Sequence, residues 1–129
     1  MSQESRKVLI VEDSPSQAAI IAELVKQAGF QPAVYTELPT GITQILAREL
    51  PILVLLDLRL LDAQGQLLAD GFQLCREIKR SPNKVPVIVV SAEGDDDACE
   101  WAKLQGADAY IQKPFMVNDL TEVITQVLS

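Results

Sequence analysis

Three carboxylates stand where apolar stretches of the chain end. Glu12 and Asp13 close the stretch that begins at Lys7, and Asp57 comes directly after residues 52–56, the most hydrophobic part of the sequence. If these stretches are neighbouring strands, the acids crowd one another, and at ~5 Å and an effective dielectric of ~20 each pair repels by on the order of 3 kcal/mol. A hard divalent cation offsets such repulsion, and Mg²⁺ prefers one or two carboxylates together with water and phosphate oxygens. The acids therefore indicate a Mg²⁺ site.

Two more polar side chains occupy equivalent places. Ser91 follows the apolar residues 85–90, and Lys113 follows the short stretch at residues 109–112. The point charge of a lysine suits a phosphoryl oxygen. Each of these residues alone could have an ordinary structural role, such as a helix cap, a turn or a loop. Together they indicate phosphoryl chemistry, because they stand at the ends of four different predicted strands.

The composition excludes several other kinds of site. The 129 residues include no histidine, so His-based zinc sites, Ser-His-Asp triads and a phosphohistidine are excluded. Cys75 and Cys99 form no CxxC pair, and we expect two free thiols. With 18 acidic and 11 basic residues, the formal net charge of −7 repels phosphate backbones, so we expect no direct nucleic-acid binding.

The length and hydropathy of the chain indicate a single globular domain without a membrane-spanning segment. An apolar content of 48% is enough for a substantial core. The apolar stretches have the length of strands and are too short to span a bilayer. The first seven residues lack the apolar segment of a secretory signal. We therefore expect a cytoplasmic protein without membrane insertion.

The elements that must position these residues alternate strictly between strand and helix. Strands are expected at residues 7–12, 33–36, 52–56, 85–90 and 109–112. The first helix, capped by Asp13 or Ser14, is expected to end at Gly29, and the others to lie at residues 41–50, 71–80, 93–105 and 117–128. This order predicts an α/β fold with a doubly wound five-stranded parallel sheet flanked by five helices. Ligands of such sheets bind at the carboxyl ends of the strands, where the polar residues fall.

Four motifs around these residues resemble the response-regulator receiver family. They are residues 8–14 (VLIVEDS), 54–57 (VLLD), 89–93 (VVSAE) and 106–115 (GADAYIQKPF). The resemblance covers nearly the whole chain. It implies the flavodoxin-like receiver fold and a single receiver domain at residues 1–129, with its core from about residue 6, of the stand-alone, chemotaxis-regulator-like kind.

The resemblance assigns a role to each acid. By it, Asp57 is the phospho-accepting aspartate, and Glu12 and Asp13 are the acidic pair that holds Mg²⁺ beside it. Asp57 itself and the backbone carbonyl of Arg59 would complete the protein's ligands to the metal.

The same resemblance assigns the remaining site residues. Lys113 matches the phosphate-binding lysine, and its peptide bond to Pro114 is expected to be cis. Ser91 matches the switch hydroxyl, and Tyr110 matches the switch aromatic.

Two features depart from the family pattern. The family usually has a proline where this chain has Leu60-Leu61, and Asp70-Gly71 comes about six residues late. The enlarged loop at residues 60–70 either tunes partner choice or phosphoryl lifetime, or is a tolerated surface insertion. The Arg59 side chain is expected at the mouth of the site, where it could pair with Glu93 or shield a phosphoryl group from water.

The implied function is that of a two-component or phosphorelay receiver. Asp57 would attack a phosphohistidine of a sensor histidine kinase or phosphotransfer protein in line, with Mg²⁺ and Lys113 neutralising charge on the phosphoryl oxygens. Ser91 and Tyr110 would then change the surface formed by the fourth helix, fifth strand and last helix, where a downstream effector protein docks. The chain would not be an enzyme beyond its own phosphorylation and dephosphorylation.

Two alternatives remain open at this point. One is a degenerate receiver that binds partners without being phosphorylated, although all the key residue types are present. The other is a phosphatase of the haloacid-dehalogenase type, which needs a second acid two positions after its aspartate. This chain has Arg59 there.

Overall fold

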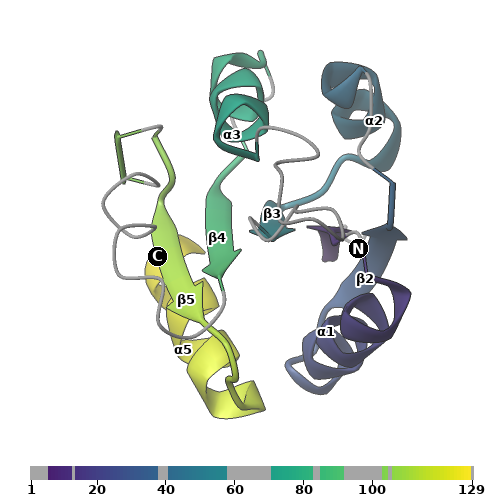
Figure 1. The fold of residues 1–129 in the computed structure, drawn as a ribbon, viewed down its shortest axis with the longest axis vertical. Helices are drawn as coiled ribbons and strands as arrows, with labels where there is room; N and C mark the ends of the chain where they lie inside the picture. Colours follow the sequence, from purple (N-terminus) through teal and green to yellow (C-terminus); the bar gives the residue numbers. More distant parts are fainter. Residues whose placement is uncertain are drawn as a thin grey trace, which may run out of the picture.

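A computed structural model of the chain describes residues 6–12, 14–37, 41–57, 71–82, 85–91, 103–104 and 106–128, and for residues 71–73 and 91 it describes the backbone only. Five parallel strands form one sheet in the order β2-β1-β3-β4-β5 (Figure 1). The strands are β1 (Lys7–Val11), β2 (Gln31–Tyr35), β3 (Leu53–Asp57), β4 (Val87–Ser91) and β5 (Ala109–Gln112). The chain moves outward from β1 to β2 and then returns to β3 on the other side of β1, so the sheet is doubly wound, as predicted.

Four helices are described, and they cover the two faces of the sheet. They are α1 (Pro15–Gln27), α2 (Ile42–Glu49), α3 (Gly71–Arg80) and α5 (Val117–Leu128). The helix expected at residues 93–105 lies outside the described residues, apart from Lys103 and Leu104, which are helical. None of the helices in the described part of the chain is long and apolar enough to cross a bilayer.

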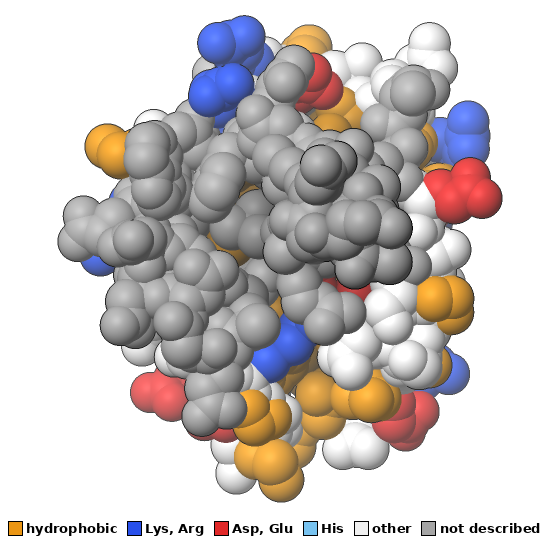
Figure 2. All heavy atoms as spheres, viewed as in Figure 1, with side chains coloured by type: hydrophobic (Ala, Val, Ile, Leu, Met, Phe, Trp, Pro, Cys, Tyr) orange, Lys and Arg blue, Asp and Glu red, His pale blue; other side chains and the backbone are white. Residues whose placement is uncertain are grey.

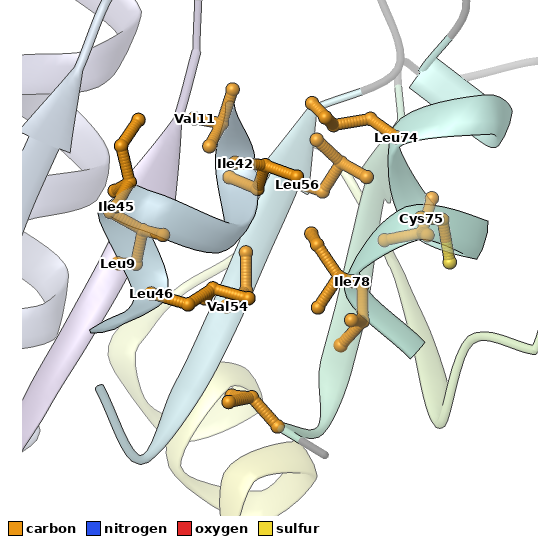
Figure 3. Close-up of a cluster of buried hydrophobic side chains, with 13 residues drawn as sticks. Leu9, Val11, Ile42, Ile45, Leu46, Val54, Leu56, Leu74, Cys75 and Ile78 are labelled. Carbon is orange, nitrogen blue, oxygen red and sulfur yellow. The ribbon is translucent and has the colours of Figure 1, made fainter. Parts of the chain in front are cut away.

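The core consists of two layers, one on each face of the sheet. Figure 3 shows the layer under α2 and α3, where side chains of β1 and β3, such as Leu9 and Leu56, meet Ile42 and Ile78. The second layer packs α1 and α5 against the opposite face through the side chains of Ile21, Val25, Leu120, Ile124 and their neighbours. All five residues of β3 are buried, as expected for a central strand covered on both faces.

The predicted strand boundaries differ from those of the structure by at most two residues. β2 begins at Gln31 and includes Pro32, which an edge strand tolerates because its outer side pairs with no other described strand. β4 begins at Val87, after Pro86, which has no N–H to donate. Leu128, the last residue of α5, is 42% exposed.

Candidate functional site

Asp57 and Glu12 lie buried at the carboxyl ends of two adjacent strands. Asp57 is the last residue of β3 and is 1% exposed, and Glu12 follows β1 and is fully buried. Because β1 and β3 pair in parallel, with Val11 opposite Leu56, both carboxyl groups arrive at the same edge of the sheet. The N–H of Glu12 donates to the carbonyl of Tyr35 at 3.0 Å, which continues the ladder to β2 beyond the end of β1.

Lys113 joins the two acids from the segment after β5. Its Nζ lies 2.6 Å from Asp57 Oδ2 and 3.2 Å from Glu12 Oε1. The lysine side chain is only 15% exposed. The residue is held at this edge by the β4–β5 pairing, in which Gln112 lies opposite Ser91. A single ammonium group therefore stands against two buried carboxyl groups.

The electrostatics of Glu12 reflect this crowding. Burial, a hydrogen bond with Asp57 and the charge of Asp57 raise the pKa of Glu12 from 4.5 to about 8. The backbone N–H of Ser14 and the charge of Lys113 oppose this rise. The environment of the site therefore favours the protonated form of Glu12.

Ser14 orients the Glu12 carboxyl group and begins the next helix. Its N–H donates to Glu12 Oε2 at 3.0 Å, and its Oγ accepts from the N–H of Gln17 at 3.4 Å as the cap of α1. Pro15 follows as the first residue of the helix. The sequence predicted the cap, with Asp13 or Ser14 as the candidates. It did not predict that the same residue would hold Glu12.

The other predicted site residues are described to different extents. Ser91 is the last residue of β4, with only its backbone described, and Tyr110 lies in β5, half-buried against the core layer of α2 and α3. The Lys113–Pro114 peptide bond is cis, the geometry that the resemblance implied. Asp13, Arg59 and the enlarged loop at residues 60–70 lie outside the described residues.

The donor set suits a hard cation with oxygen ligands. Within the described residues no third carboxylate or cysteine joins Glu12 and Asp57, while Asp13 lies beyond them. The pKa of Glu12 is raised by burial and then by its neighbour Asp57, and a divalent cation would offset the repulsion between the two carboxyl groups. On the face seen in Figure 2, the described acidic and basic side chains are scattered and gather into no patch of one sign.

Fold and site together define the class of protein: a doubly wound α/β domain with a carboxylate–lysine site at its strand ends. Comparison with known proteins agrees, since residues 8–125 match the family described as response regulator receiver domain. The chain belongs to this family.

Individual relatives extend the comparison. The chain is 31% identical over 121 residues to the nitrogen assimilation regulatory protein NtrX of Azorhizobium caulinodans. The aligned region covers 94% of this chain and 26% of NtrX. It is 33% identical over 121 residues to the DNA-binding response regulator MtrA of Mycolicibacterium smegmatis, covering 93% of this chain and 49% of MtrA. The chain therefore spans half or less of the length of these relatives.

Solved structures show the same fold. A protein of Chloroflexus aurantiacus described as a response regulator superposes with a TM-score of 0.80 at 25% identity, covering 97% of this chain and 98% of that one. NtrX from Brucella abortus superposes with a TM-score of 0.79 at 26% identity, covering 97% of this chain and 27% of that one.

Proposed function

We propose that Asp57 accepts a phosphoryl group from a phosphohistidine of a sensor histidine kinase or phosphotransfer protein. The observation that carries the proposal is the bridge by Lys113 between Asp57 and Glu12, two acids buried at the carboxyl ends of adjacent parallel strands. A carboxylate beside a fixed ammonium group is a suitable acceptor. As the phosphoryl group is transferred, the ammonium group can stabilise the negative charge on the phosphoryl oxygens.

The side chains divide the work of the transfer. An oxygen of Asp57 attacks the phosphorus in line as the bond to the histidine nitrogen breaks. Lys113 Nζ, 2.6 Å from Asp57 Oδ2, stabilises an oxygen of the phosphoryl group in transit. Glu12 is kept in place by the N–H of Ser14, so little rearrangement is needed during the reaction.

Mg²⁺ is the expected cofactor. Glu12, Asp13, Asp57 and the backbone carbonyl of Arg59 would hold it, and when bound it would supply positive charge for the phosphoryl oxygens. The crowding of Glu12 and Asp57 supports this assignment. Burial raises the pKa of Glu12 most, and the neighbouring Asp57 raises it further; a cation that both acids share would offset the second of these effects.

Phosphorylation would change the surface formed by the fourth helix, β5 and α5, where a downstream effector protein docks. Ser91 would engage the phosphoryl group, and Tyr110 would then move into the space that Ser91 leaves. Leu104, near the end of the expected fourth helix, and Met116, just before α5, are 73% and 69% exposed. We further propose that residues 1–129 form one cytoplasmic receiver domain that is not an enzyme beyond its own phosphorylation and dephosphorylation.

Labelling with a small phosphodonor tests the proposal. Acetyl phosphate with Mg²⁺ should add one phosphoryl group to the wild type, and Asp57→Asn should remain unlabelled in intact-mass spectra. An exposed acid on α5, changed by Glu122→Gln, serves as the matched control and should be labelled like the wild type. Equal labelling of Asp57→Asn would refute the assignment. No labelling of the wild type would favour the degenerate receiver that binds partners without phosphorylation.

A further inference from the structure

A polar cluster between α2 and the sheet lies outside the predicted site. The Tyr35 hydroxyl donates to Glu49 Oε2 at 2.7 Å, and Lys7 Nζ lies 3.0 Å from Glu49 Oε1. Glu49 is the last residue of α2, whereas Lys7 and Tyr35 belong to β1 and β2. The Glu49 and Lys7 side chains are only 19% and 26% exposed, so the carboxylate is shared by two partners in a partly buried place.

The charges of this cluster are mutually supporting. The hydrogen bond from Tyr35, followed by that from Lys7, holds the pKa of Glu49 below its usual value. The same bond to Glu49 raises the pKa of the Tyr35 hydroxyl. Both shifts favour a neutral Tyr35 phenol beside a Glu49 carboxylate, and the cluster connects the end of α2 to both strands.

Tyr35 connects this cluster to the acidic site. It is the last residue of β2, an edge strand that pairs only with β1 among the described strands. Its carbonyl accepts the N–H of Glu12 at 3.0 Å, so the backbone of Glu12 rests on the end of β2. The Tyr35 side chain, packed against the core layer of α2 and α3, keeps that strand end in position on one side.

We propose that Tyr35 and Glu49 are positioning residues for the acidic site: Glu49 fixes the Tyr35 side chain, and the Tyr35 carbonyl fixes the backbone that carries Glu12. The inference rests on the proposed Mg²⁺ site. Mg²⁺ requires nearly ideal octahedral geometry at ~2.0–2.1 Å, so a small displacement of the Glu12 backbone weakens binding. Tyr35 and Glu49 act on Glu12 only indirectly, through the backbone. We therefore expect their substitution to weaken Mg²⁺ binding by ~2–10-fold, less than the ~10–100-fold typical of groups that contact metal ligands directly.

The test is calorimetric titration of the unphosphorylated protein with MgCl₂. Tyr35→Phe, which removes one hydroxyl, should weaken Mg²⁺ binding, and so should Glu49→Gln. The double variant should bind no more weakly than Tyr35→Phe alone, because both changes interrupt one connection. The matched control is Lys79→Met, which removes a comparable ion pair. Lys79 Nζ lies 2.7 Å from Asp108 Oδ2, and Asp108 precedes β5 at the edge of the sheet away from the acidic site.

The outcomes are distinct. Weaker Mg²⁺ binding by Tyr35→Phe and Glu49→Gln, with Lys79→Met like the wild type, supports the inference. Wild-type affinity in both variants, or an equal loss in Lys79→Met, overturns it and leaves the proposed function intact. A wild type that binds no Mg²⁺ would instead refute the metal site itself, and this inference with it.

Discussion

At the scale of single residues, Lys113 provides the positive charge that compensates two buried acids. Its ammonium group is in contact with both Asp57 and Glu12, and it comes from a position 56 residues from the first and 101 from the second. Removing one partner of a buried ionic cluster is far more destabilising than the net contribution of the cluster suggests, because the remaining charges lose their compensation. Lys113 is therefore a structural part of the site, in addition to its proposed role in phosphoryl transfer.

Lys113→Met should accordingly destabilise the metal-free protein, by about 2–4 kcal/mol. It should bind Mg²⁺ at least as tightly as the wild type, because a competing positive charge has gone. Urea denaturation with and without Mg²⁺ measures both effects. Lys79→Met removes the more exposed ion pair with Asp108 and should cost at most ~1 kcal/mol. Equal stability of Lys113→Met and the wild type without metal would contradict the role given to this lysine.

At the scale of elements, both ends of α2 have a residue in the left-handed backbone conformation, a glycine at one end and a leucine at the other. Gly41 precedes the helix with a φ of 89°, which glycine adopts freely, whereas Leu50 follows it with a φ of 47°. Leu50 is 62% exposed, so its side chain contributes little packing in return. The end of α2 thus carries backbone strain next to Glu49, the residue that binds Tyr35 and Lys7.

Leu50→Gly should therefore stabilise the protein, by up to ~1 kcal/mol, since relief of the left-handed strain exceeds the added entropy of the unfolded chain. Gly41→Ala is the converse change and should destabilise by ~1 kcal/mol or more, because its new Cβ would also lie 3.2 Å from Gln44 Oε1. Urea midpoints of the two variants give the comparison. A Leu50→Gly protein clearly less stable than the wild type would show that the leucine side chain matters more than its backbone.

The packing of the elements determines which parts of the site could be predicted from sequence. Strand ends could be predicted, because an apolar run followed by a charged residue is typical of a buried strand that reaches the sheet edge, and parallel strands bring their carboxyl ends to one edge. The meeting of Glu12, Asp57 and Lys113 followed from that rule. The contacts of Glu49 did not, because its partners Tyr35 and Lys7 lie 14 and 42 residues away and the pairing depends on how α2 packs on the sheet.

At the scale of the whole molecule, the site makes the stability of the fold depend on pH and, through the proposed metal site, on Mg²⁺. The pKa of Glu12 is raised from 4.5 to about 8 in the folded protein. Between these values the folded protein binds a proton that the unfolded chain has released. The contribution of Glu12 to the free energy of unfolding is therefore fully present below pH ~4.5 and is lost as the pH rises towards ~8.

Mg²⁺ should reverse part of this loss. A ligand that binds only the folded state stabilises it by RT ln(1 + [L]/Kd), which is ~2.7 kcal/mol at one hundred times Kd. Because the metal and the proton compete for Glu12, the apparent Mg²⁺ affinity should rise as the pH increases through this range. The stabilisation by a fixed Mg²⁺ concentration should therefore be larger at pH ~8.5 than at pH ~5.5.

Glu12→Gln isolates the contribution of this carboxyl group to the whole. The glutamine keeps an acceptor for the N–H of Ser14 and carries no charge at any pH, so the metal-free variant should lose less stability than the wild type between pH ~5.5 and ~8.5. It should also gain less from Mg²⁺, whereas the exposed-site control Glu122→Gln should follow the wild type in both respects. The measurement is urea denaturation of the three proteins at both pH values, with and without Mg²⁺. If wild type and Glu12→Gln lose stability in parallel and respond equally to Mg²⁺, the carboxyl group is neither the source of the pH dependence nor a ligand of the metal. Glu12 would then be only a buried acid held by Ser14 and Lys113.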